Sequence, residues 1–214
     1  MRATPPKLGP IPRKLILKIS CASSGNRSNR TQPKRQRRPE NVSGPIYVDH
    51  TCIDCDTCRW MAPETFTAIN GASATSVQPD RGSPERHAAL QALLSCPTFS
   101  IHVEDSSPGE LAAARDSFPL PISGTKNVCH LGHHAEQSYG AAPYLIVRPG
   151  LGNIMVDVPR WSPQLAQRIQ AVGGAKYIFL SHRDDVFGHD RWAQHLGSKR
   201  IIHALEANTR QGTE

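Results

Sequence analysis

The chain has 214 residues, of which 38% are hydrophobic and only 6% aromatic, and its formal net charge is +7. This length allows one large domain or two small ones. No apolar run approaches the ~20 residues that a membrane-spanning helix needs, so we expect a soluble protein without a membrane span. Specific nucleic-acid binding is not expected either. It needs a basic face on a folded element, whereas residues 1–38 carry eleven basic and no acidic residues and the remainder is net negative.

Residues 1–44 form a basic segment rich in Arg, Lys, Ser, Pro and Asn, and its first acidic residue is Glu40. This composition is typical of an organellar transit peptide, and the Ser and Pro content favours the chloroplast over the mitochondrion. We therefore predict a disordered, transit-peptide-like segment and a chloroplast location. A plain disordered basic tail has a similar composition, and a mitochondrial or cytoplasmic location stays open as the alternative.

Residues 45–104 have the pattern of a small folded unit. Apolar runs at 46–48, 74–77 and 100–103 predict short strands. Ser83-Pro84-Glu85 predicts the start of a helix, with serine as the N-cap and proline at the first helical position, and Pro97 ends it. A unit of this size buries little core, so packing alone supplies it with little stability.

Four cysteines within this unit carry its chemistry. Cys52, Cys55 and Cys58 are separated by two residues each, and Cys96-Pro97 follows 38 residues after Cys58. Two-residue spacers bring three sulfurs to one side of a short loop, and a remote fourth can close the opposite corner of an iron–sulfur cube. Zinc, which also accepts Cys-x-x-Cys pairs, is the alternative. Cys21 and Cys129 are interpreted as ordinary thiols.

Residues 46–103 therefore resemble a single-cluster 4Fe–4S ferredoxin. The resemblance implies that Cys52, Cys55, Cys58 and Cys96 bind one 4Fe–4S cluster and that the unit transfers single electrons. One departure is Phe99, which stands where the family more often has a small residue, commonly glycine, so crowding of this turn is expected.

Residues 105–127 contain several Ser, Pro and acidic residues and are interpreted as a linker. Residues 128–214 then alternate between strand and helix patterns. We expect a hairpin from 144–147 and 154–158, a helix from Ser162-Pro163 to about residue 172, a strand at 177–180, a further helix through Trp192 and His195, and a strand at 201–202. This alternation predicts an α/β layer.

The hairpin that ends in Asp157 and the strand that ends in Phe179-Leu180-Ser181-His182 resemble the first part of a metallo-β-lactamase fold. That family follows the strand with His-x-His-x-Asp-His, which binds one or two metal ions. Here only His182 matches the first ligand, so an atypical site remains as the hypothesis, which would use His182, Asp184, Asp185 and His189 to bind zinc, iron or manganese.

Simpler interpretations of these polar residues compete with metal binding. Asp184 and Asp185 also suit the N-terminus of the next helix, where acidic residues are favoured. His130, His133 and His134 form a second histidine-rich run, for which we expect a solvated loop. The fold class predicted for the whole chain is α+β, with a disordered N-terminal tail, a ferredoxin-like domain and an incomplete metallo-β-lactamase-like layer.

The sequence thus supports two main functions, and a protein–protein module with a purely structural cluster is a third possibility. The first is a plastid iron–sulfur protein that exchanges electrons with a redox partner protein. The two parts together resemble a fusion of ferredoxin and metallo-β-lactamase-like domains found in photosynthetic lineages, which implies the plastid setting. The alternative is a metal-dependent hydrolase or oxidoreductase with an accessory cluster. Neither the substrate nor the oligomeric state follows from the sequence.

Overall fold

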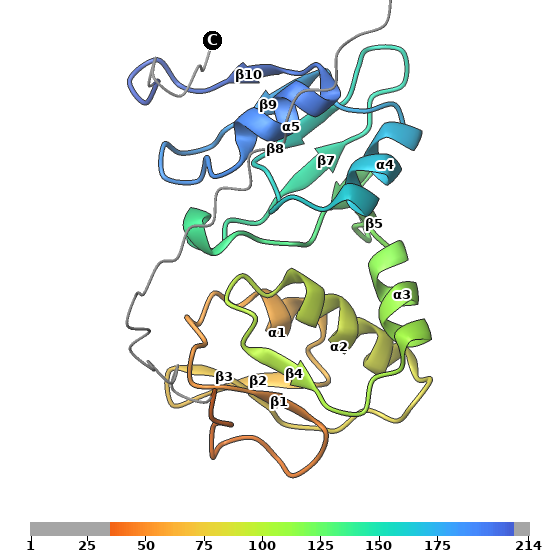
Figure 1. The fold of residues 1–214 in the computed structure, drawn as a ribbon, viewed down its shortest axis with the longest axis vertical. Helices are drawn as coiled ribbons and strands as arrows, with labels where there is room; N and C mark the ends of the chain where they lie inside the picture. The colour runs from red at the N-terminus through yellow and green to blue at the C-terminus, as the bar shows by residue number, and fades with distance from the viewer. Residues whose placement is uncertain (1–34, 208–214) are drawn as a thin grey trace, which may run out of the picture. The chain divides into compact units, whose positions relative to one another are not determined.

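A computed structural model describes residues 35–207 (Figure 1). Most of the predicted transit segment and the last seven residues lie outside the described residues. Residues 35–44, which the sequence assigns to the basic segment, already contact the first strand. The amide of Arg38 donates to the carbonyl of Val48 at 3.0 Å, and the Asn41 side-chain oxygen accepts from the Val48 amide at 2.9 Å.

The first folded part consists of two small sheets and two helices. Its elements are β1 (Ile46–Val48), α1 (Thr57–Met61), β2 (Phe66–Ile69), β3 (Ala72–Thr75), α2 (Pro84–Ser95) and β4 (Ile101–Val103). Strands β1 and β4 pair antiparallel, and β2 and β3 form a hairpin. The core is small and includes Phe66, Ala89 and Ile101 together with two of the cysteines, as expected for a unit of this length.

Helix α2 begins as the sequence predicts. The Ser83 hydroxyl accepts a hydrogen bond from the amide of Arg86 at 3.1 Å, and Pro84 occupies the first helical turn. The helix ends at Ser95, and the amide of Cys96 still donates to the carbonyls of Ala92 and Leu93. The fourth cysteine therefore lies at the carboxyl end of a rigid helix.

Residues 105–127 are not the linker predicted from their composition. They contain α3 (Pro108–Asp116) and β5 (Leu120–Pro121). Helix α3 has a capping box between Ser107 and Glu110, and Arg86 of α2 binds both Glu110 at 2.7 Å and Asp105 at 2.8 Å. Capping and ion pairing thus fix a segment whose Ser, Pro and acidic residues indicate only polarity when they are considered without their partners.

The second folded part is a six-stranded mixed sheet in the order β10-β9-β8-β7-β6-β5 (Figure 1). Its elements after β5 are β6 (Val128–His130), the short 3-10 helix η1 (Glu136–Ser138), β7 (Tyr144–Ile146), β8 (Ile154–Val156), α4 (Pro163–Ala171), β9 (Tyr177–Phe179), α5 (His189–Leu196) and β10 (Lys199–Ile201). The predicted hairpin is β7–β8, and β8, β9 and β10 run parallel.

Helices α4 and α5 connect the parallel strands and contribute buried side chains to this part of the core. Ile169 of α4 and Trp192 of α5 are fully buried, in one cluster with Leu145, Met155 and Ile178 of the sheet. The alternation of strand and helix predicted for this region is confirmed.

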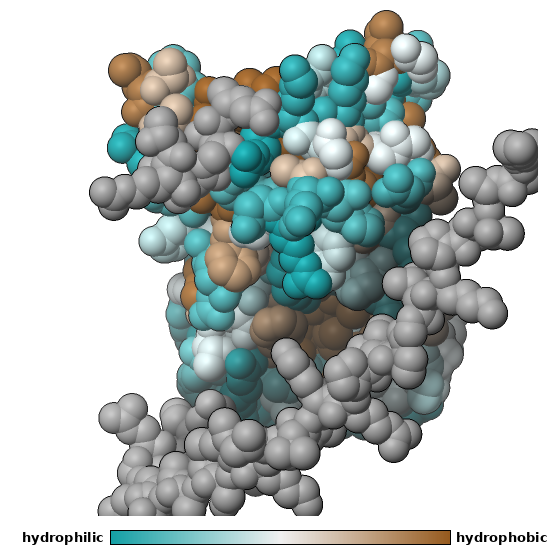
Figure 2. All heavy atoms as spheres, turned by 45° about the horizontal axis from the view of Figure 1, so that its top comes forward, coloured by the Kyte–Doolittle hydropathy of each residue, from teal (hydrophilic) through white to brown (hydrophobic). Residues whose placement is uncertain are grey.

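The described residues form a mixed α/β structure with five α-helices. Within this part of the chain, no helix has both the length and the apolar character required to cross a bilayer. The face drawn in Figure 2 combines hydrophilic residues with brown, hydrophobic patches. Several large apolar side chains are exposed, and three of them, Ile53, Trp60 and Phe99, lie next to the motif cysteines in the sequence.

Candidate metal-cluster site

The four cysteines of the predicted motif meet at one cavity. Cys52, Cys55 and Cys58 approach it from the loop and first turn of α1, and Cys96 approaches from the end of α2. All four are free thiols. The structure therefore brings the remote fourth cysteine to the other three, as a shared cluster requires.

The loop between the cysteines has a strained backbone that one arginine stabilises. Asp54 and Asp56 adopt left-handed conformations, with φ of 57° and 66°, which aspartate tolerates better than most residues. Arg59 of α1 forms ion pairs with both, at 2.6 Å to Asp54 and 2.5 Å to Asp56. These ion pairs hold the loop in the shape that presents its sulfurs.

Each side of the cavity supplies hydrogen-bonding groups to a sulfur. The Cys55 thiol donates to the Thr57 hydroxyl at 3.4 Å, the Cys58 thiol donates to the Ser73 hydroxyl at 3.2 Å, and the amide of Ser100 donates to Cys96 Sγ at 3.3 Å. When the cysteines bind metal as thiolates, their protons are gone and both hydroxyls are free to donate to sulfur instead. Such hydrogen bonds help to set the potential of an iron–sulfur cluster.

The electrostatics of the cavity favour a bound cation. Burial raises the pKa of Cys58 to about 12, and the charges of Cys52, Cys96 and Cys55 act in the same direction, against the hydrogen bond to Ser73. Four thiolates placed this close repel one another unless positive charge lies between them. Since cysteine ligands must be deprotonated to bind metal, iron would supply that charge, and the donor set fits a thiolate-held cluster.

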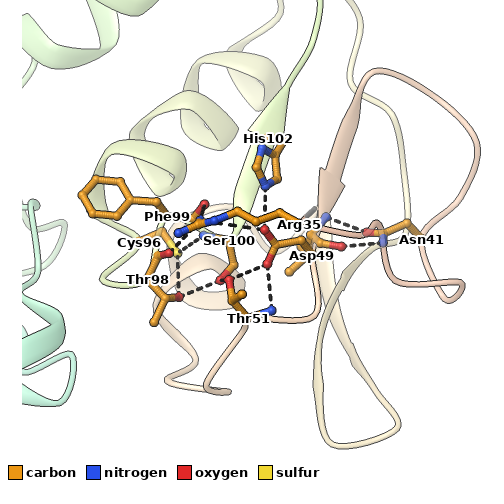
Figure 3. A network of polar contacts seen from close by, with 10 residues as sticks. Arg35, Asn41, Asp49, Thr51, Cys96, Thr98, Phe99, Ser100 and His102 are labelled. Atoms are coloured by element: carbon orange, nitrogen blue, oxygen red, sulfur yellow. Dashed lines mark hydrogen bonds and ion pairs between the residues drawn. The ribbon is translucent and has the colours of Figure 1, made fainter. Parts of the chain in front are cut away.

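A buried polar network connects the first strand to Cys96 (Figure 3). Asp49, which is 0% exposed, accepts hydrogen bonds from the Thr51 amide and hydroxyl and contacts His102 Nε2 at 2.8 Å. The Thr51 hydroxyl lies 2.7 Å from the hydroxyl of Ser100, and the backbone amide of Ser100 donates to Cys96 Sγ. The network fixes the turn after Cys96 and is assembled from residues that the sequence does not mark as functional.

Phe99 removes no ligand, and its backbone explains why a small residue is common there. Its φ is 56°, in the left-handed region that favours glycine. Phe99 is 52% exposed, and the Cζ atom of Arg160 lies over its ring, 4.2 Å from the ring centroid. The Phe99 carbonyl accepts a hydrogen bond from Arg35 at 2.7 Å. The expected crowding is avoided because the ring points outward.

The histidine run that follows Cys129 is buried, which corrects the expectation of a solvated loop. His130 and His134 are 0% exposed and their Nε2 atoms lie 2.7 Å apart, and His133 is also buried. Burial lowers the pKa of His130 to about 3 and of His134 to about 4. His134 Nδ1 lies 3.2 Å from the Thr57 hydroxyl, which in turn contacts Cys55.

The segment that follows these histidines also approaches the cysteine loop. Gly140, just after η1, has a φ of +83°, and a Cβ at this position would lie 3.3 Å from the Cβ of Cys55 and 3.3 Å from Pro97. Both the backbone conformation and the close approach therefore favour glycine here. Gly140 and His134 of the second folded part thus lie beside the cysteine loop, which the sequence spacing does not predict.

The second predicted metal site is only partly assembled. Asp184 and His189 line a separate open cavity, and His182 Nδ1 lies 3.7 Å from Asp184. Within residues 35–207 no group of three His, Cys, Asp or Glu side chains is arranged to hold a single metal ion. This criterion concerns one ion and not a 4Fe–4S cluster, which is larger. The capping interpretation of Asp184 and Asp185 is wrong, because α5 begins at His189 with Gly188 as its N-cap.

Residues at the start of this region have a structural role. Asp157 directly follows β8, and its carboxylate accepts hydrogen bonds from both the amide and the hydroxyl of Ser181, each at 2.8 Å. This pair connects the residue after β8 to the second residue after β9. Asp157 therefore holds the loop that contains His182 through Ser181. Within residues 35–207 its side chain forms no hydrogen bond or ion pair with His182 itself.

Comparison with known proteins supports the first site. No curated protein matched the chain. Residues 48–103, about a quarter of the chain, match the family model described as the 4Fe–4S single cluster domain of Ferredoxin I, and the match includes all four cysteines that line the cavity.

Proposed function

We propose that this protein is an electron carrier in which Cys52, Cys55, Cys58 and Cys96 hold one 4Fe–4S cluster. The observation that carries the proposal is the convergence of these four thiols, from a loop and from the end of a helix 38 residues later, on one cavity. When bound, such a cluster accepts and releases one electron at a time. The match of residues 48–103 to a single-cluster ferredoxin domain supports the same role.

The surface around the cysteines is suited to contact with a redox partner protein. Ile53 in the cysteine loop is 48% exposed, Trp60 of α1 is 46% exposed, and Phe99 after Cys96 is exposed as well. Exposed apolar side chains beside a site are typical of surfaces that bind other proteins. We propose that a partner approaches the cluster over these residues, so that the electron crosses a short distance.

Two finer expectations remain proposals. The chloroplast location rests on the composition of residues that the structure does not describe. The likeness of residues 128–214 to a metallo-β-lactamase rests on the β7–β8 hairpin that leads to Asp157 and on β9, which leads to His182. The metal-dependent hydrolase or oxidoreductase is tested by metal content. This alternative requires zinc, iron or manganese in addition to the four irons of the cluster, and that additional metal should be lost in His182→Ala.

The cluster itself is tested by anaerobic purification of the full chain. We expect about four irons and four sulfides per chain, visible absorption that bleaches on reduction, and an electron-paramagnetic-resonance signal in the reduced state. Cys96→Ala should lose most of the iron, whereas Cys129→Ala, a partly buried thiol in β6 outside the cavity, should keep it. Stoichiometric zinc without sulfide, or full iron content in Cys96→Ala, would contradict the proposal.

A further inference from the structure

Arg160 lies in the segment between β8 and α4 and reaches across to the end of α2. Its guanidinium donates to the carbonyls of Leu94 at 2.6 Å, Cys96 at 3.0 Å and His134 at 2.8 Å. Two of these carbonyls belong to the carboxyl end of α2, where carbonyl groups lack helical partners and carry partial negative charge. The side chain is therefore held in one position beside the backbone of a cluster ligand.

Unlike Arg59 and Arg86, Arg160 has no carboxylate partner among residues 35–207. Arg59 pairs with two aspartates, and Arg86 pairs with Asp105 and Glu110. For Arg160 the recorded acceptors are carbonyl oxygens only. Charged groups withdrawn from water are ordinarily paired with an opposite charge, so the missing counter-charge requires an explanation.

The surroundings of Arg160 indicate where that counter-charge would lie. The guanidinium donates to the carbonyl of Cys96 at 3.0 Å, so a cluster bound through Cys96 would place negative charge beside it. The neighbouring His133 and His134 supply no negative charge; their own pKa values are lowered, chiefly by burial and also by Arg160. The Arg160 Cζ also lies over the ring of Phe99, 4.2 Å from its centroid, which is a cation–π contact.

We propose that Arg160 is the counter-ion of the 4Fe–4S cluster, so that a residue of the second folded part raises the reduction potential of a cluster held by the first. The inference rests on the proposed function. A thiolate-held cluster is anionic and gains one more negative charge on reduction, and net charge near a cluster is one of the quantities that set its potential. A fixed cation beside Cys96 stabilises the reduced form more than the oxidised form.

The test compares midpoint potentials of the cluster-loaded full chain, measured by anaerobic redox titration. Arg160→Met removes the charge, Arg160→Gln removes the charge but keeps hydrogen-bond donors, and Arg160→Lys keeps the charge. Arg191→Met is the matched control, because Arg191 also stacks on an aromatic ring, that of Trp161 at 4.2 Å, but lines the other cavity. It changes the net charge of the protein equally.

We expect both neutral variants to shift the reduction equilibrium at least tenfold toward the oxidised form, which is 59 mV for one electron. Arg160→Lys and Arg191→Met should stay within about threefold of the wild type. A neutral variant with full iron and sulfide content and an unchanged potential would overturn the inference. A wild-type protein without iron and sulfide would instead refute the proposed function.

Loss of the cluster from the neutral variants would still decide the question through Arg160→Lys. If the lysine variant retains the cluster at the wild-type potential, positive charge is what the site requires, and the inference stands. If the lysine variant also loses the cluster, the hydrogen-bond geometry of the guanidinium holds the segment, and the counter-ion role is wrong.

Discussion

Replacing Asp49 by asparagine tests the buried network that supports Cys96. In the folded protein the carboxylate accepts from the Thr51 amide and hydroxyl and contacts His102 Nε2. Burial alone would raise the pKa of Asp49, but the hydrogen bonds from Thr51 and His102 outweigh it and hold this pKa below its ordinary value. The ionised form therefore stabilises the fold above pH ~4, and its contribution is lost as the pH falls.

The expected loss follows from the change in each hydrogen bond. A bond to a charged acceptor is worth about 1.5–3 kcal/mol and one to a neutral acceptor about 0.5–1.5 kcal/mol. The amide oxygen can keep both bonds from Thr51 in the weaker form, while the new NH₂ group faces His102 in place of an acceptor. Because an amide is also easier to bury than a carboxylate, we expect a net loss of about 2–3 kcal/mol in the free energy of unfolding.

The assay is anaerobic urea unfolding followed by circular dichroism. With a slope of about 2 kcal/mol/M, the midpoint should fall by about 1–1.5 M. Asp80→Asn is the matched control, because Asp80 is exposed, and its midpoint should move by less than about 0.25 M, in line with other surface substitutions. An Asp49→Asn midpoint equal to that of the control would refute the role assigned to the network.

Three further predictions concern the core, the glycine beside the cysteine loop and the buried histidines. Ile169→Ala should lower the free energy of unfolding by about 2–4 kcal/mol, measured by thermal or urea unfolding, because Ile169 is fully buried. Val172→Ala is the control and should lower it only slightly, because Val172 is more exposed. Equal losses would contradict the core assignment. Gly140→Ala should accelerate loss of visible absorption in air several-fold compared with Gly150→Ala, which has a similar positive φ of +76° but no neighbour within 4 Å; equal rates would mean that only backbone strain matters. Stability should fall as the pH drops from 7 toward 5, by up to about 1.4 kcal/mol per pH unit for each histidine, because burial lowers the pKa of His130 to about 3 and of His133 to about 4, and the unfolded chain binds protons first. His130→Phe should flatten this dependence, and an unchanged slope would show that His130 does not cause it.

Local sequence patterns predict much of this structure, because the forces behind them act over a few residues. Ser83-Pro84 marks the start of α2, and the short spacing of three cysteines forces their sulfurs together. The β7–β8 hairpin and α4 are likewise marked by glycines, proline and an amphipathic repeat. These features can be predicted without knowing which distant residues are in contact. For them, the sequence-based expectation and the structure agree.

The remaining features depend on contacts between distant parts of the chain, which a single sequence does not reveal. The histidine run looks like a polar loop until Thr57, 77 residues earlier, is placed beside His134. Arg160 is an ordinary basic residue until the carbonyl of Leu94 is found 2.6 Å away. The same applies to residues 105–127, whose order comes from pairing with Arg86 and with β6. In each case the polar residue type is visible in the sequence, but its partner is not.

The most direct test of the central claim is electron paramagnetic resonance of the anaerobically purified, dithionite-reduced full chain, with iron and sulfide measured on the same sample. We predict about four irons and four sulfides per chain and a signal that integrates to about one unpaired electron per cluster, lost in Cys96→Ala and retained in Cys129→Ala. A silent sample that contains zinc without sulfide, or a signal that persists without Cys96, would contradict the convergence of these four thiols on one redox cluster.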